Sequence, residues 1–190
     1  MNSYRTSKSS KTIVLDRDGV INQDSSSYIK SAEEWIPISG SINAIARLHQ
    51  ANFRVIIASN QSGLARGYFD EYALARMHNK MNSLVEDSGG VISAIFYCPH
   101  SPDAGCSCRK PKTGLLQRAE VEFDISLAGD YFVGDSLKDL QAAISFNMKP
   151  ILVRTGKGKQ TEVSLSDEIR NQTRIFDDLE SAVNWILEKQ

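Results

Sequence analysis

Short apolar runs alternate with segments of helical periodicity along most of the chain. Apolar runs bounded by polar or glycine-rich stretches are typical of buried strands. Five such runs occur, at 12–15, 54–58, 91–97, 131–134 and 150–153, and a weaker one lies around 175–176. Apolar residues three and four apart predict helices over 41–51, 70–86, 113–122 and 138–146, and over a terminal segment that begins near Leu179. We expect the polar segment 154–173 to be a loop or a weak helix.

This alternation of strands and helices predicts an α/β fold in which helices cover both faces of a mainly parallel sheet. The sequence contains no internal repeat and no linker rich in Gly, Ser or Pro. We therefore interpret residues 1–190 as one domain, with a flexible N-terminal segment at 1–10.

Composition and charge narrow the class of protein. The chain has 190 residues, 41% of them hydrophobic, and a net charge of −1, which gives no overall attraction to nucleic acid. No stretch approaches the roughly 18 apolar residues of a membrane span, and the first residues lack the apolar run of a signal peptide. We expect a cytoplasmic monomer whose partner is a small molecule, neither nucleic acid nor membrane.

Polar residues follow several of the predicted strands. In an open parallel sheet the ligand binds beyond the carboxyl ends of the strands. The side chains expected there are three acids, a hydroxyl, an amide and two cations: Asp16, Asp18, Asp135, Ser59, Asn60, Arg109 and Lys110. His49 and His78 lie in helical segments, and we interpret both as surface or packing residues.

This set of side chains fits phosphoryl transfer. A carboxylate can attack phosphorus and form an aspartyl phosphate, and catalysis then depends on positioning and on charge stabilisation. A second acid two residues after the nucleophile can protonate the leaving oxygen and later deprotonate water. Carboxylates are also the hard oxygen ligands that Mg²⁺ prefers.

All the cysteines lie in the single segment CPHSPDAGCSCRKPK. Cys98, His100, Cys106 and Cys108 form a Cys₃His set suited to tetrahedral zinc, and in a reducing compartment such a cluster favours metal binding over disulfides. Four protein ligands would close the site, so the zinc is expected to be structural. The zinc loop, residues 98–108, would then direct Arg109 and Lys110 toward the strand ends.

Four sequence motifs resemble those of the haloacid dehalogenase-like phosphohydrolases: LDRDGVIN, IIASNQSG, Lys110 and VGDSLKDL. The resemblance implies a Rossmann-like three-layer α/β/α fold. It implies Asp16 as nucleophile, Asp18 as general acid/base, and Ser59 and Lys110 as phosphoryl stabilisers. It also implies Mg²⁺ held by Asp16, Asp135 and the backbone carbonyl of Asp18.

The zinc loop ending in CRKP is similar to that of two groups within this family, heptose bisphosphate phosphatases and histidinol-phosphate phosphatases. NQSGLARGYF and LVRTGKG resemble the heptose group of bacterial lipopolysaccharide synthesis, which implies loss of the sugar's 7-phosphate. The residues that would bind the substrate are Asp24, Ser25, Ser26, Ser27, Asn60, Gln61, Ser62 and Arg109. Ser136 departs from the Lys that some relatives carry, which puts a substrate contact there in doubt.

The segments 19–57 and 63–109 are too short to hold the large cap domain found in many members of this family. We therefore expect an open site. Two alternatives remain open at this stage: a zinc-loop interaction module with no activity, and a phosphotransferase that retains its aspartyl phosphate. Asp18 argues against the second, because a base at that position would hasten hydrolysis.

Overall fold

The computed structural model describes residues 11–189. Its six strands are β1 (Thr12–Leu15), β2 (Arg54–Asn60), β3 (Ala94–Cys98), β4 (Tyr131–Gly134), β5 (Lys149–Val153) and β6 (Arg174–Phe176). They form one sheet in the order β3-β2-β1-β4-β5-β6, and every neighbouring pair is parallel. The predicted parallel α/β fold is confirmed.

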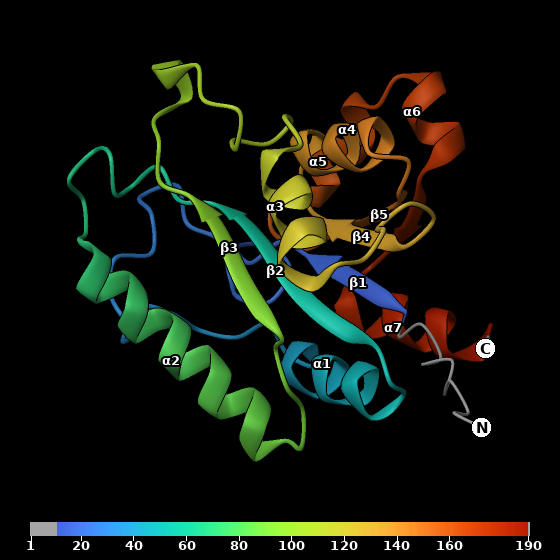
Figure 1. The fold of residues 1–190 in the computed structure, drawn as a ribbon, viewed down its shortest axis with the longest axis horizontal. Coiled ribbons are helices and arrows are strands. Elements are labelled where there is room, and N and C mark those ends of the chain that lie inside the picture. Colours follow the sequence, from blue (N-terminus) through green and yellow to red (C-terminus); the bar gives the residue numbers. More distant parts are fainter. Residues whose placement is uncertain (1–10, 190) are drawn as a thin grey trace, which may run out of the picture.

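Seven α-helices surround this sheet in residues 11–189: α1 (Ser41–Gln50), α2 (Glu71–Asp87), α3 (Gly114–Phe123), α4 (Leu137–Ser145), α5 (Gly158–Ser164), α6 (Asp167–Gln172) and α7 (Leu179–Glu188). Figure 1 shows α1, α2 and α7 on one side of the sheet and α3 and α4 on the other. None of the helices in this part of the chain is long and apolar enough to cross a membrane.

Successive side chains along each strand pack alternately into two hydrophobic cores, one on each face of the sheet. Ile13 and Leu15 pack toward α1, α2 and α7, whereas Val14 between them packs toward α3 and α4. Ile56 likewise belongs to the second cluster while its neighbours on β2 belong to the first. Successive strand side chains point to opposite faces, so a continuous apolar run fits a sheet that is buried on both sides.

Most predicted boundaries agree with the structure to within a residue, but β2 extends to Asn60 instead of residue 58, and three other segments also differ. The third strand begins at Ala94 instead of residue 91, and Val91 is 43% exposed. The polar segment 154–173 forms two short helices, α5 and α6. Within the predicted zinc loop, Pro102–Ala104 forms a 3₁₀ turn.

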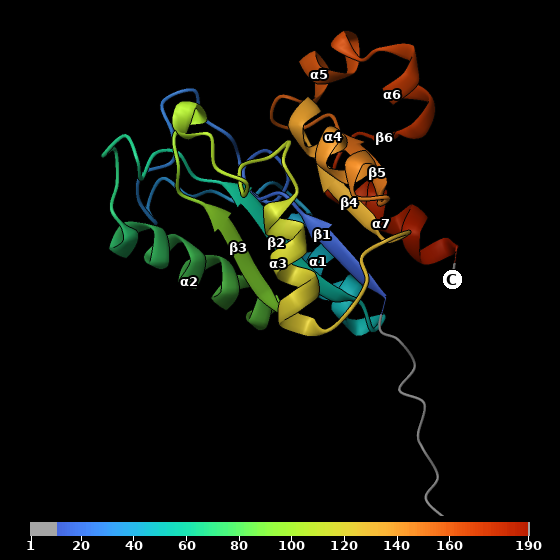
Figure 2. The same cartoon turned by 45° about the horizontal axis from the view of Figure 1, so that its top comes forward.

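The connections that leave β1, β2 and β3 emerge at the same edge of the sheet (Figure 2). The segments 16–40 and 61–70, which follow β1 and β2, contain no helix and no strand longer than an isolated bridge. No cap domain stands over this edge within residues 11–189, as expected, and the site there is reached through loops.

Candidate active site

The edge formed by the strand ends contains a cavity of about 470 Å³. Twelve of the residues predicted to act there line it: Asp16, Asp18, Asp24, Ser25, Ser26, Ser59, Asn60, Gln61, Ser62, Arg109, Lys110 and Asp135. Ser27 does not line the cavity; its backbone N–H donates to the hydroxyl of Ser25. Parallel strands thus bring together side chains that are far apart in the sequence.

Lys110 joins three elements in the centre of this site. Its side chain is 3% exposed, and Nζ lies 2.7 Å from the Ala58 carbonyl oxygen, 3.0 Å from Asp16 Oδ1 and 2.6 Å from Asp139 Oδ1. Burial alone would lower the pKa of Lys110, but the carboxylates of Asp139 and Asp16 hold that pKa above its usual value. Lys110 is therefore a fixed cation beside Asp16.

Asp16, Asp135 and Asp139 form a buried acidic cluster, with one oxygen of each within 4.8 Å of the others. Burial, and then repulsion from Asp16 and Asp139, raises the pKa of Asp135 to about 8. Burial also raises the pKa of Asp16, although Lys110 opposes the effect. A divalent cation would relieve this repulsion, and oxygen donors of this kind suit Mg²⁺, so the predicted ligands Asp16 and Asp135 fit such an ion.

Asp139 has partners of its own. Besides Lys110 it accepts hydrogen bonds at Oδ2 from the backbone N–H of Ser136 at 3.0 Å and from the Ser136 hydroxyl. Together these two residues cap the start of α4. Asp139 therefore links the Lys110 ammonium to the start of α4.

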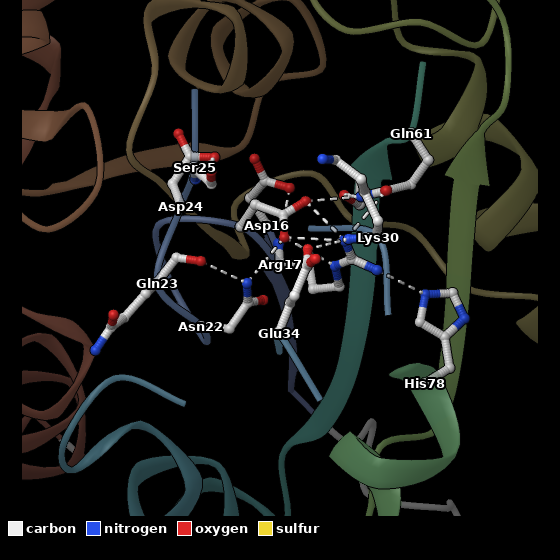
Figure 3. A network of polar contacts seen from close by, with 12 residues as sticks. Asp16, Arg17, Asn22, Gln23, Asp24, Ser25, Lys30, Glu34, Gln61 and His78 are labelled. Atoms are coloured by element: carbon white, nitrogen blue, oxygen red, sulfur yellow. Dashed lines mark hydrogen bonds and ion pairs between the residues drawn. The ribbon is translucent and has the colours of Figure 1, made fainter. Parts of the chain in front are cut away.

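Asp18 accepts hydrogen bonds from several donors, of which Arg17, Asn22 and Gln61 are labelled in Figure 3. Arg17 Nη2 is 2.9 Å from both carboxylate oxygens, Asn22 Nδ2 donates to Oδ1 at 2.9 Å, and Gln61 Nε2 donates to Oδ2 at 2.8 Å. Burial alone would raise the pKa of Asp18, but Arg17 and these hydrogen bonds hold it below its usual value. Gln61 Nε2 also donates to the hydroxyl of Ser59 at 2.8 Å, which links that hydroxyl to the network.

Asn60 ties the end of β2 to the segment that carries the two predicted cations. Its Nδ2 donates to the Lys110 carbonyl at 3.2 Å, and its Oδ1 accepts from the Lys110 backbone N–H at 3.1 Å. Arg109 Nη1 donates to the carbonyl of His100 at 3.3 Å. The predicted zinc loop and the strand end therefore hold Arg109 and Lys110 from two sides.

The four predicted zinc ligands come together in the structure. Cys98 Sγ lies 3.6 Å from Cys106 Sγ and 3.2 Å from Cys108 Sγ, and the latter two are 3.5 Å apart. His100 Nδ1 is 3.6 Å from Cys98 Sγ and 3.3 Å from Cys108 Sγ. A tetrahedral ion with Zn–S bonds of about 2.3 Å requires sulfurs roughly 3.8 Å apart, so this donor set would hold zinc after the sulfurs move apart by a few tenths of an ångström.

Three further residues take part in the site but were not predicted from the sequence, which indicated only a surface or packing role for His78. Arg17 is 1% exposed and is bound to Asp18, and His78 Nε2 lies 3.4 Å from Arg17 Nη1, so His78 is part of the network. Lys157 lines the cavity and forms an ion pair with Asp24 at 2.8 Å. The motif LVRTGKG could have indicated Lys157, whereas the contact to His78 depends on how α2 packs.

Comparison with known proteins gives a consistent picture. A protein-family model described as HAD-hydrolase-like matches residues 107–182. The D-glycero-beta-D-manno-heptose-1,7-bisphosphate 7-phosphatase of Pseudomonas aeruginosa is 50% identical over 176 residues, covering 93% of this chain and 97% of the relative.

Two solved structures are similar over nearly their whole length. The D,D-heptose 1,7-bisphosphate phosphatase from B. bronchiseptica, complexed with magnesium and phosphate, has a TM-score of 0.90 and 48% identity, covering 95% of this chain and 99% of that one. The D,D-heptose 1,7-bisphosphate phosphatase from Burkholderia thailandensis has a TM-score of 0.72 and 40% identity, covering 93% and 98%.

Close packing around Asp135 leads to a stability prediction. Gly156 has φ +55°, and a Cβ there would lie 2.2 Å from Asp135 Oδ2 and 2.5 Å from Gly19 Cα. Left-handed strain of about 1–2 kcal/mol and a comparable cost of overpacking should together lower the free energy of unfolding by about 2–4 kcal/mol in Gly156→Ala. Urea unfolding measures the difference.

Gly129→Ala is the matched control. Gly129 has φ +83°, but nothing lies within 4 Å of the position of an added Cβ, so only the left-handed strain applies. Equal destabilisation of the two variants would show that the contact between Gly156 and Asp135 is unimportant.

Proposed function

The chain belongs to the haloacid dehalogenase-like heptose bisphosphate phosphatases and is a phosphatase, and we propose that it removes the 7-phosphate of D-glycero-β-D-manno-heptose 1,7-bisphosphate through an aspartyl phosphate on Asp16. The observation that carries the mechanism is Asp16 itself: its Oδ1 lies 3.0 Å from the buried Lys110 ammonium, and it faces a cavity of about 470 Å³. Curated relatives of this similarity carry the heptose name, so histidinol-phosphate phosphatase is not favoured.

In the first step a carboxylate oxygen of Asp16 forms a bond to phosphorus while the bond from phosphorus to the sugar oxygen breaks. Asp18 lines the same cavity and, in its protonated form, gives its proton to that leaving oxygen. Lys110 stabilises the charge on the transferring group, and Ser59 donates a hydrogen bond to it. Asp18, now a carboxylate, then takes a proton from the water that attacks phosphorus, which frees phosphate and restores Asp16.

Magnesium would be held by Asp16, Asp135 and the backbone carbonyl of Asp18. When bound, it offsets the repulsion between the Asp16 carboxylate and the phosphate oxygens. The raised pKa of Asp135 supports this assignment, because the two cationic side chains at the centre of the site are already engaged elsewhere: Lys110 with Asp16 and Asp139, and Arg17 with Asp18.

Zinc would be held by Cys98, His100, Cys106 and Cys108, with a structural role. The loop also has protein contacts of its own, since Lys112 Nζ donates to the carbonyls of Gly105 and Cys106 at 2.9 and 2.8 Å. The cytoplasmic location and the monomeric state stay predictions, as does a role in the synthesis of lipopolysaccharide heptose.

The nucleophile assignment predicts that Asp16→Asn lowers kcat by a factor on the order of 10⁴ or more, because an amide does not attack phosphorus. Phosphate release should be measured with the heptose bisphosphate, fructose bisphosphate and histidinol phosphate, with and without Mg²⁺. The exposed Asp167→Asn should behave as wild type. Turnover that persists in Asp16→Asn, or without Mg²⁺, would contradict the mechanism.

The zinc assignment predicts about one zinc per chain in protein purified without chelators, and loss of that zinc in Cys106→Ser. The loop contributes only Cys98 to the second core, with Cys106 and Cys108 packed at its edge, so we expect local disorder and reduced activity, with far-ultraviolet circular dichroism nearly unchanged. Ser107→Ala, an exposed neighbour, should keep its zinc. Wild-type protein free of zinc would rule out the site.

Arg109 is proposed to grip the phosphate that does not react. It lines the cavity next to Lys110, and its planar fork can donate two hydrogen bonds to phosphate oxygens. Arg109→Ala should therefore cost about 2–3 kcal/mol in kcat/KM with the bisphosphate, roughly 30- to 150-fold, and far less with p-nitrophenyl phosphate.

Two variants serve as controls for this prediction. Lys110→Ala should impair both substrates, because Lys110 acts at the transferring group. Arg66→Ala, in the exposed part of the loop after β2, should impair neither. Equal losses on both substrates in Arg109→Ala would mean that Arg109 only supports the zinc loop through its bond to the His100 carbonyl.

A further inference from the structure

Arg17 stands between the two proposed catalytic aspartates in the sequence, and its side chain is 1% exposed. Its guanidinium is wrapped around Asp18: Nη2 lies 2.9 Å from each carboxylate oxygen, and Nε donates to Oδ1 at 3.1 Å. Burying a guanidinium is costly, and any single acidic neighbour could neutralise it. The multiple contacts specify an orientation as well as a charge.

The guanidinium is itself fixed from two other elements. Its Nη2 donates to Gln61 Oε1 at 3.1 Å, just beyond the end of β2, and its Nη1 lies 3.4 Å from His78 Nε2 on α2 (Figure 3). Burial, helped by the charge of Arg17, lowers the pKa of His78 to about 4. The ring is therefore neutral near pH 7, and Nε2 is free to accept a hydrogen bond from Arg17.

The remaining hydrogen bonds also fix the orientation of the Asp18 carboxylate. Asn22 reaches Oδ1 and Gln61 reaches Oδ2, so each oxygen meets donors from two directions. The Asp18 side chain still keeps 23% of its exposure and lines the cavity. A general acid/base must present its oxygen to the reacting atom within hydrogen-bond reach, so the direction of this carboxylate matters for catalysis.

We propose that Arg17 is the positioning residue that aims Asp18 at the leaving oxygen, and that His78 and Gln61 hold its guanidinium in place. This inference rests on the proposed role of Asp18 in the phosphatase reaction. Arg17 also lines the cavity, but its guanidinium is engaged by Asp18, Gln61 and His78. Arg17 acts through Asp18: the fork fixes the direction of the carboxyl group and, because it favours the carboxylate, it promotes transfer of the Asp18 proton to the leaving oxygen.

The leaving group separates this role from a purely structural one. As the bond from phosphorus to the leaving oxygen breaks, an alkoxide must receive the Asp18 proton, whereas p-nitrophenolate departs as a stable anion. The value of kcat/KM covers steps up to departure of the leaving group, so later hydrolysis of the aspartyl phosphate does not affect it. A misdirected Asp18 should therefore harm substrates in proportion to the basicity of the leaving oxygen.

The test measures kcat/KM for a series of aryl phosphates of rising leaving-group basicity and for glycerol 2-phosphate. In Arg17→Met we expect a loss of about 10²-fold for glycerol 2-phosphate and of only about threefold for p-nitrophenyl phosphate, within the range of general acid catalysis. Arg17→Lys keeps the buried cation without the fork and should show the same trend. Parallel losses along the whole series would overturn the proposal.

His78 provides a variant that leaves Arg17 in place in case Arg17→Met does not fold. His78→Leu removes the acceptor. It should lower the ratio of kcat/KM for glycerol 2-phosphate to kcat/KM for p-nitrophenyl phosphate about fivefold, the same direction as in Arg17→Met. His78→Gln restores an acceptor and should return the ratio close to the wild-type value. His49→Leu, on α1 and outside the network, should leave the ratio unchanged. An unchanged ratio in His78→Leu would contradict the proposed hold on the guanidinium.

Asp18→Asn distinguishes failure of this inference from failure of the proposed function. If Asp18 is the general acid, this variant shows the steepest dependence on the leaving group. A steep Asp18→Asn series with flat Arg17 and His78 series would refute the inference alone. A flat Asp18→Asn series would refute the role of Asp18, and the inference with it.

Discussion

The buried ammonium of Lys110 is the contact on which the geometry of the site depends. It has three N–H groups, and they meet three oxygens: the Ala58 carbonyl, Asp16 Oδ1 and Asp139 Oδ1. These oxygens belong to β2, to the end of β1 and to α4, so one side chain connects three elements of the sheet edge. Asp16 therefore sits beside a cation whose position is set by the fold.

The acids of the site are divided between cations. Lys110 forms ion pairs with Asp16 and Asp139, and Arg17 forms an ion pair with Asp18. Within residues 11–189 the Asp135 carboxylate accepts a single hydrogen bond, from the backbone N–H of Lys157 at 2.7 Å, and its pKa is raised to about 8. This imbalance is what a divalent cation would correct, which gives a physical reason for a magnesium-dependent reaction at this edge.

The sequence predicted the parallel sheet and most of the site, because apolar runs that end in Asp16, Ser59 or Asp135 mark strands and their carboxyl ends together. For 154–173 it predicted a loop or a weak helix and did not separate the two short helices found there, since few apolar positions mark them. Nor did it predict the roles of Arg17 and His78. From the sequence alone, Arg17 would be assigned to the surface like most charged residues. His78 contacts Arg17 only because α2 packs across the loop that follows β1.

The central claim is that Asp16 itself carries the phosphoryl group during turnover. Mixing the enzyme with substrate labelled in the transferring phosphate, quenching in acid within milliseconds and mapping the labelled peptide tests it directly. The account predicts label on the peptide that contains Asp16, which appears before free phosphate and decays into free phosphate as the substrate is used up. Turnover with no label on the chain, or with label on another residue, would contradict it.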